Sequence, residues 1–251
     1  MKTQKILNDY SVINNISSID KDLHNQIFSH CIIAIGICSE IAENIDFGEV
    51  IRDILSLESN FIETEYNPSN EVKKISNIAI DNNNFHKLRN NNIKINKIIN
   101  IGNFYIDNCM LKTKVERDLL DWDIDFNELE TVSKHIYNSC MLALIINKYE
   151  DIDIDINKVL KLLMLHKENE IFPNEPINTL VKNLNKKDEI ISLINEYNLN
   201  ESKEAKFANN ISNLELSLQS IIYENKGYKK YNNKPTEDFK KILIKAKKEL
   251  K

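Results

Sequence analysis

The segment LLMLHKENE, residues 162–170, ends an apolar run with a histidine, a lysine and then a glutamate. A histidine followed directly by an aspartate at such a place would supply half of a metal site, because divalent ions take imidazole and carboxylate ligands. Here Lys167 follows His166, and a protonated lysine has no lone pair to offer a metal. The segment therefore suggests metal chemistry while placing a positive charge beside the candidate ligand.

The elements that carry these residues are expected to be helices. Of the 251 residues, 42% are hydrophobic and 28% are charged, but only four are glycine and four are proline. So few turn-forming residues do not suit a many-stranded protein, and we expect an all-α fold. Apolar positions at helical spacing predict the main helices, at 25–43, 50–57, 129–147 and 159–165.

The charge and the apolar runs exclude some classes of partner. The net charge is −5 and the isoelectric point is near 5.7, so no long-range field attracts nucleic acid or an anionic membrane. The apolar run at 31–38 is too short for a bilayer, which takes about 20 helical residues, and residues 1–10 do not resemble a signal peptide. We therefore expect a cytoplasmic protein that binds neither nucleic acid nor a membrane.

The cysteines and the acidic alternations are expected to have structural roles. Four cysteines lie in apolar helical patterns, which is typical of reduced, buried thiols: Cys31, Cys38, Cys109 and Cys140. The acidic runs DWDIDF and EDIDIDIN have the aspartate spacing of a calcium loop but lack its glycine and its last glutamate. We interpret these runs as solvated loops and helix starts.

The order of helices occurs twice along the chain. A helix pair, a proline-containing loop and a later helix follow one another in each half, at an offset of roughly 105–110 residues. This repeat predicts two tandem helical domains, at 1–110 and 111–251, with pseudo-dimeric packing of the two as a further possibility. The end of the chain, residues 235–251, is amphipathic and is expected to form a helix that docks on the second domain.

Three segments in the second half together resemble a known family. They are VERDLLDWDIDFNELETVSKHIYNSCMLALI, LLMLHKENEIFPNEP and EYNLNESKEAKFANNISNLELSLQSIIYE. In this order they resemble the HD-domain phosphohydrolases, in the branch of the 5'-deoxynucleotidases. The resemblance covers residues 111–228 and implies an all-helical domain in which a divalent metal activates water against a phosphate ester.

The resemblance implies a metal site that has lost part of its ligands. The family holds its metal with a histidine, a His-Asp dyad and a last aspartate. His135 and His166 fill the two histidine places, whereas Lys167 and Ser212 stand where the two aspartates are expected. Both changes remove carboxylates, and Lys167 adds a charge that repels a divalent ion.

Other acidic residues match the family pattern around this site. Glu170 corresponds to an acid beside the metal site, Glu175 falls near the acid of the following loop, and Glu215 matches the glutamate of the last helix. Glu170 and Glu175 are therefore the candidates for a catalytic role, if one remains. The frame of the site persists while its metal-binding centre is damaged.

The first half resembles the family less. His30 stands in the first ligand place, but Leu57 and Glu58 occupy the dyad, and Gly102 or Asn103 the last place. Its segment NPSNEVKK still resembles the one that follows the dyad in the nucleotidases. We interpret this half as a second copy that has diverged further.

Each of the histidines and Lys167 also has a simpler interpretation. A lone core histidine is most often a hydrogen-bonded structural residue, and polar neighbours place His24 and His86 at the surface. Lys167 is either exposed, or fills the vacated metal site and pairs with Glu170 or Glu168, or holds a ligand's phosphate. We favour the second of these, because an ammonium among residual acids replaces the charge of the missing cation.

The function that these observations favour is non-catalytic. We expect a pseudoenzyme that keeps the HD-like fold as a module for binding a protein partner or a nucleotide, without a cofactor. One alternative is a metal-dependent phosphohydrolase with an altered site, holding Mn, Co, Fe, Zn or Ni and using Glu168 or Glu170 as a ligand. The other is a binder that sequesters a nucleotide. The chain is expected to be a monomer with pseudo-dimeric domains or a homodimer.

Overall fold

The chain folds into helices joined by short connections. The computed structural model describes residues 2–19, 22–59, 61, 63, 66–81, 84–90 and 93–231, and these contain no strand, only the isolated bridges Val115–Thr131 and Trp122–Lys230. The α-helices are α1 (Lys2–Ile19), α2 (Leu23–Glu40), α3 (Phe47–Glu58), α4 (Asn70–Ile80), α5 (Asn84–Asn90), α6 (Ile95–Asn108), α7 (Val132–Tyr149), α8 (Ile156–Leu165), α9 (Asn178–Val181), α10 (Lys187–Leu199) and α11 (Lys203–Asn225). Four short 3-10 helices are η1 (Cys109–Lys112), η2 (Arg117–Leu119), η3 (Phe126–Glu128) and η4 (Glu168–Glu170). The all-α prediction is confirmed for the described residues.

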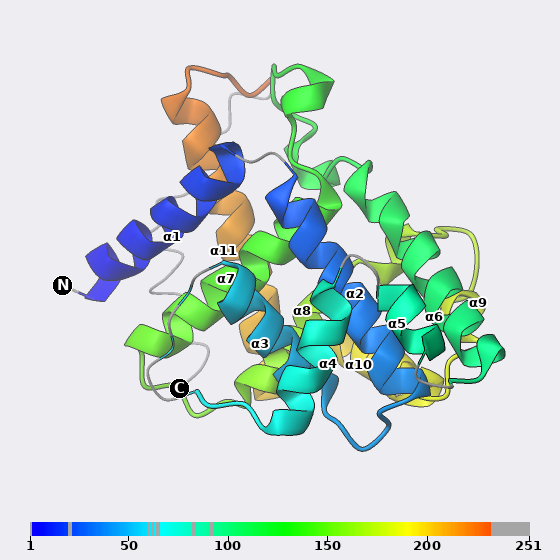
Figure 1. Ribbon diagram of the computed structural model, residues 1–251. Coiled ribbons are helices and arrows are strands. Elements are labelled where there is room, and N and C mark those ends of the chain that lie inside the picture. Colours follow the sequence, from blue (N-terminus) through cyan, green and yellow to red (C-terminus); the bar gives the residue numbers. More distant parts are fainter. Residues whose placement is uncertain are drawn as a thin grey trace.

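Two helices run through the middle of the molecule and organise the others. α2 and α7 are buried on nearly every face, as expected of helices packed between other helices. α2 packs against α3, α4, α6 and α7, while α7 packs against α1, α8 and α11. In Figure 1, α2 and α7 lie centrally, with α1 at one edge of the molecule and α6 at the opposite edge. The side chains that α7 contributes to the candidate site are therefore buried.

The two predicted domains share one hydrophobic core. One cluster of buried apolar side chains extends from Ile6 in α1 to Leu218 in α11. α2 meets α7, where Ser133 Oγ donates to Asn25 Oδ1 at 2.8 Å, and α3 meets α8. α1 also packs on α7, across the predicted boundary at residue 110. The division into two domains remains a prediction, and the residues on both sides of the predicted boundary contribute to one core.

Side-chain caps decide where the helices begin. α7 begins at Val132 instead of residue 129, because the Thr131 hydroxyl accepts from the Lys134 amide at 3.4 Å. α8 begins at Ile156, because the Asp155 carboxylate accepts from the amides of Asn157 and Lys158. The acidic run EDIDIDIN is therefore a loop and a helix start, as predicted. α8 ends at Leu165, so His166 lies directly after its last turn.

Two expectations about burial are wrong. His24 was expected at the surface because of its polar neighbours, but it is buried, since α2 is covered on that side as well. Cys109 is only half-buried, because it lies where α6 passes into η1, whereas Cys31, Cys38 and Cys140 are buried as predicted. The predicted C-terminal helix at 235–251 lies outside the described residues.

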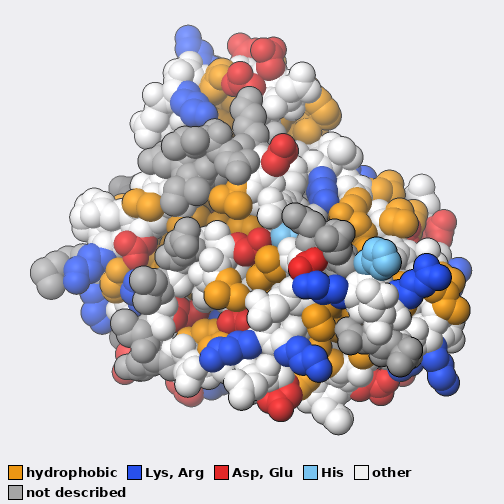
Figure 2. Space-filling model, viewed as in Figure 1, with side chains coloured by type: hydrophobic (Ala, Val, Ile, Leu, Met, Phe, Trp, Pro, Cys, Tyr) orange, Lys and Arg blue, Asp and Glu red, His pale blue; other side chains and the backbone are white. Residues whose placement is uncertain are grey.

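The described surface carries side chains of both charges. On the face in Figure 2, basic and acidic side chains alternate, and hydrophobic side chains occur in small groups. None of the described helices is long and apolar enough to cross a membrane. The mixed charge agrees with the low net charge of the sequence.

Gly48 tests the contact between α3 and α8. A Cβ at this position would lie 2.4 Å from the backbone oxygen of Asn157, which cannot move without shifting α8. We expect Gly48→Ala to lower the free energy of unfolding by about 1–3 kcal/mol. Urea unfolding followed by circular dichroism measures the change.

Gly102→Ala is the matched control for this substitution. Gly102 lies inside α6, and a Cβ there meets only Phe85 at 3.8 Å, an ordinary contact distance. Because alanine is the better helix former, we expect unchanged or slightly higher stability, by up to about 1 kcal/mol. Equal stability of Gly48→Ala and Gly102→Ala would contradict the close approach of α3 and α8.

Candidate functional site

Two histidines predicted from separate segments meet inside the second half. His135 comes from the first turn of α7 and is fully buried, and His166 follows α8 with only 8% of its surface exposed. Their Nε2 atoms lie 3.3 Å apart, and their rings meet edge to face with centroids 5.4 Å apart. The packing of α7 against α8 creates this pair.

The other nitrogen of each ring fixes the protonation of the pair. His135 Nδ1 lies 2.6 Å from Glu215 Oε2, and His166 Nδ1 lies 2.6 Å from the carbonyl oxygen of Leu163. A carboxylate and a carbonyl oxygen only accept hydrogen bonds, so both Nδ1 atoms carry hydrogen. The Nε2 atoms of both rings face the same place.

Ser212, from α11, lies beside the Nε2 atoms of both histidines. Its hydroxyl is 3.0 Å from His135 Nε2 and 3.4 Å from His166 Nε2, so it can donate its one proton to only one of them at a time. The Tyr197 hydroxyl of α10 bonds the same serine, and the Tyr197 and His166 rings lie 5.0 Å apart. Burial lowers the pKa of His166 well below its usual value, and nearby His135 and Lys167 add to this effect. The imidazole of His166 is therefore neutral near pH 7.

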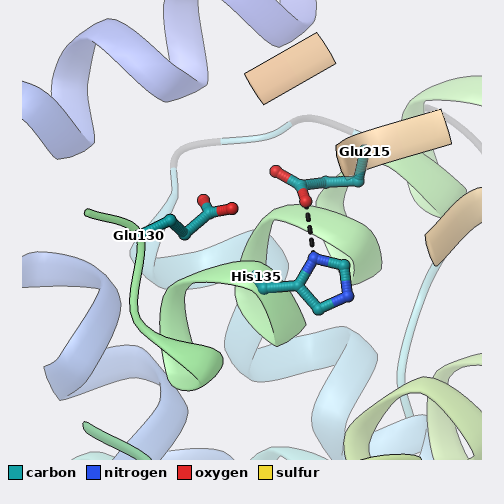
Figure 3. Close-up of side chains that lie close together, drawn as sticks. All are labelled: Glu130, His135 and Glu215. Carbon is teal, nitrogen blue, oxygen red and sulfur yellow. Dashed lines mark hydrogen bonds and ion pairs between the residues drawn. The ribbon is translucent and has the colours of Figure 1, made fainter. Parts of the chain in front are cut away.

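Buried acids support His135 from the side opposite Ser212. Glu215 accepts from the Tyr10 hydroxyl at 3.0 Å and from Asn138 Nδ2 at 3.3 Å, in addition to His135. Asn138 also donates to Glu130 at 3.0 Å. Figure 3 shows the Glu215 carboxylate directed at the imidazole, with Glu130 facing the same space. Burial, and then the nearby Glu215, raise the pKa of Glu130 well above its usual value, so Glu130 is protonated.

These acids orient His135 and are not arranged as a metal site of their own. Ligand atoms of Glu130, His135 and Glu215 lie within 4.8 Å of one another. However, the His135 nitrogen on this side is Nδ1, whose hydrogen is already donated to Glu215. A carboxylate behind a histidine in this way fixes the tautomer that leaves Nε2 available.

Lys167 lies beside the histidine pair in an ion-pair network. Its ammonium is 2.8 Å from Glu116 Oε1 and 3.5 Å from Glu170 Oε1. Burial lowers the pKa of Lys167, but the attraction of Glu116 outweighs burial and the pKa is raised overall. Lys167 is therefore protonated. Of the two predicted partners, Glu170 and Glu168, Lys167 pairs with Glu170, and its nearer partner Glu116 was missed.

The residues present do not fit the four-ligand metal site that the HD resemblance implies. Two imidazole nitrogens that bind one zinc-like ion at about 2.0–2.1 Å lie roughly 3.3–3.4 Å apart at the tetrahedral angle, which the histidine pair satisfies. The other two places hold the neutral Ser212 and the protonated Lys167. Two imidazoles and a hydroxyl are a weak set, because they give a divalent ion only two good ligands and no carboxylate charge, and the nearby Lys167 ammonium repels it.

The remaining predicted residues are distributed differently. Glu175 is exposed and lines a separate pocket of about 430 Å³ between α6 and α9, together with Asn103. In the first half, His30 Nδ1 lies 2.8 Å from Glu58, so the first ligand place and one dyad place do meet there. Leu57 is exposed. Gly102 lies in α6, near Phe85 of α5.

Glu116, Glu130, Tyr10 and Tyr197 are site residues that sequence reasoning missed. Glu116 and Tyr10 are 51 and 205 residues from the partners they contact, so no local pattern connects them. Only Glu130, five residues before His135, carries a weak signal, as the last acid before an apolar helix.

Lys167 is expected to be important for stability because of Glu116. The Glu116 side chain is 1% exposed, and Lys167 is its cationic partner. We expect Lys167→Met to lower the free energy of unfolding by about 3–5 kcal/mol, because a buried carboxylate loses its cation. Urea unfolding at pH 7 measures this loss.

A second substitution and a surface lysine serve as controls. Adding Glu116→Gln to Lys167→Met removes the stranded charge and is expected to restore most of the stability. Lys203→Met breaks the Lys203–Asp153 pair, which has the same 2.8 Å distance but is exposed, and should change little. A small effect of Lys167→Met would contradict the buried ion pair.

Glu168 is expected to make the protein less stable as the pH rises. It is 1% exposed, and neither of its carboxyl oxygens has a hydrogen-bond partner among the described residues. Burial, and then the nearby Asp107, raise its pKa well above the usual value. A raised folded-state pKa contributes stability below the unfolded pKa of about 4.3, and this is lost progressively as the pH rises toward the folded value.

Glu168→Gln keeps the neutral form at every pH. We expect this variant to match the wild type near pH 4.5 and to be more stable at pH 8, measured by thermal unfolding across that range. Glu201→Gln, at an exposed glutamate, is the control and should follow the wild-type pH dependence. Parallel pH profiles for Glu168→Gln and the wild type would contradict this prediction.

The comparisons with known proteins give one match. A family model described as HD domain matches residues 167–250, a range that begins directly after His166 and includes Ser212 and Glu215. Residues 232–250 of this range lie outside the described part of the chain. No curated protein and no solved structure matches the chain. The match supports an HD-type domain in the second half, in agreement with the resemblance of its motifs.

Proposed function

We propose that this protein is a non-catalytic relative of the HD phosphohydrolases that uses the helical fold to bind a protein partner or a nucleotide. The observation that carries the proposal is the protonated Lys167, held by Glu116 and Glu170 beside His166. The family's metal ligand at this place is an aspartate. A fixed ammonium instead of a carboxylate replaces attraction of a divalent ion by repulsion, in a poorly solvated site where such forces are strong.

The state of the second lost ligand supports the same proposal. Ser212 bonds both histidines and Tyr197, so its hydroxyl is used within the site. Hydrolysis by an HD enzyme requires a metal-bound water, and carboxylate ligands supply negative charge that strengthens the binding of the metal. Neither Ser212 nor Lys167 supplies that charge.

Metal analysis and an activity assay together test this proposal. We expect protein purified without chelators to hold no stoichiometric Mn, Co, Fe, Zn or Ni, and to release no phosphate from nucleoside monophosphates when these ions are added. Release of phosphate that depends on metal and disappears in His166→Ala would overturn the proposal.

A variant that restores the lost carboxylates is the positive control. Lys167→Asp with Ser212→Asp returns both acids, and Glu116→Gln prevents repulsion between Glu116 and the new Asp at 167. We expect this triple variant to bind Mn or Co by calorimetry where the wild type does not. Equal metal binding by the two proteins would show that Lys167 does not exclude the ion.

A second candidate function is supported by the geometry of the histidine pair. The two imidazoles face each other with Nε2 atoms 3.3 Å apart, a spacing that suits two nitrogens bound to one cation. This favours a metal-dependent phosphohydrolase with an altered site. Glu170 is tied to Lys167, and Glu168 has a raised pKa, so neither is an available anionic ligand as it stands. A metal found at stoichiometric amount and lost in His135→Ala would favour this candidate.

The role of Lys167 as a phosphate anchor is less favoured. Its ammonium already pairs with two carboxylates, so a phosphate would have to compete with both. Nucleotide binding by this chain is therefore better sought at lysines that have no acidic partner.

A further inference from the structure

A second cavity lies behind the buried acids, outside the histidine pair. It has a volume of about 300 Å³ and lies between α1, the first turn of α7 and the last turns of α11. Its apolar wall includes Leu218 and Ile222, and its polar lining includes Tyr10, Lys134, Gln219 and Lys226. Apolar and polar groups line this cavity in about equal parts, and a concave site in which polar groups converge beside an apolar wall can hold a small molecule.

The two lysines of this cavity give it a positive charge. Neither Lys134 nor Lys226 forms an ion pair with any residue that the structure describes. Lys134 is close enough to Glu130 to lower its pKa, but the two side chains form no ion pair. The lysines are therefore available to an anion that enters the cavity.

Gln219 supplies an unused acceptor in the same cavity. The residue is 3% exposed, and its side chain bonds the Tyr223 hydroxyl. Its Oε1 is buried and has no hydrogen-bond partner among the described residues. Leaving such an acceptor unpaired costs about 1–3 kcal/mol, which a donor on a bound ligand would recover.

We propose that this cavity binds a small organic phosphate whose apolar or aromatic body carries an N–H or O–H donor. The phosphate pairs with Lys134 and Lys226, the body packs on Leu218 and Ile222, and the donor meets Gln219 Oε1. A nucleoside monophosphate has all three features. The cavity is separate from the histidine pair, so the inference stands whether or not that pair hydrolyses phosphate esters.

Tyr10 connects this cavity to the histidine pair. It lines the cavity, and its hydroxyl donates to Glu215, which holds His135. Because α1 forms one wall, a bound ligand is expected to restrain α1 against α11. Slower amide hydrogen exchange in residues 4–13 on binding would report this restraint.

Calorimetry with AMP, adenosine and inorganic phosphate tests the proposal on the full chain. We expect AMP to bind, and adenosine and inorganic phosphate each to bind at least about tenfold more weakly, since each lacks one half of the contacts. No AMP binding at millimolar concentration, or equal affinity for adenosine and AMP, would overturn it.

Substitutions locate the binding site. The double variant Lys134→Gln with Lys226→Gln is expected to weaken AMP binding by about tenfold or more, and Gln219→Leu to weaken it severalfold. Lys182→Gln, at a lysine of the 430 Å³ pocket, should bind AMP as the wild type does. Binding lost in His166→Ala but kept in the double lysine variant would place AMP at the histidine pair and refute this site.

Discussion

The buried carboxylate of Glu215 is the interaction on which the centre of this protein depends. It accepts hydrogen bonds from His135, Tyr10 and Asn138, and so joins α11 to α7 and α1. A carboxylate with no exposed surface is tolerated only when such donors replace its water. The donors stabilise the buried carboxylate, and the carboxylate in turn positions its donors. It fixes the tautomer of His135 and holds Tyr10 at the wall of the second cavity. The histidine pair and that cavity therefore have a common support.

The sequence predicted the parts of the site that lie on helices with a recognisable pattern. His135, His166, Ser212 and Glu215 were identified from short motifs, and the structure brings them together as a buried group. The all-α fold followed from composition and from the 3.6-residue spacing of apolar positions. Each of these features lies within a single helix, so it can be recognised from the sequence alone.

The residues that contact the site from distant segments of the chain could not be predicted from the sequence. Glu116 reaches Lys167 from a loop, Tyr197 reaches Ser212 from α10, and Tyr10 reaches Glu215 from the other end of the chain. Each contact depends on how the helices pack. A single glutamate or tyrosine is not part of a periodic sequence pattern, so the sequence does not show which residue it will contact. His24 failed for a related reason: its neighbours along the chain are polar, but its neighbours in space cover it.

The positions predicted to match in the two halves carry different chemistry. In the second half the imidazoles of His135 and His166 face each other, and the cation beside them, Lys167, pairs with Glu116 and Glu170. In the first half a histidine and a glutamate, His30 and Glu58, pair directly. A histidine beside an acid needs no further ion at that nitrogen, because the acid satisfies its Nδ1 hydrogen. Glu215 satisfies His135 in the same way, so the difference between the halves is the second histidine, His166, whose Nε2 meets that of His135 beside Ser212.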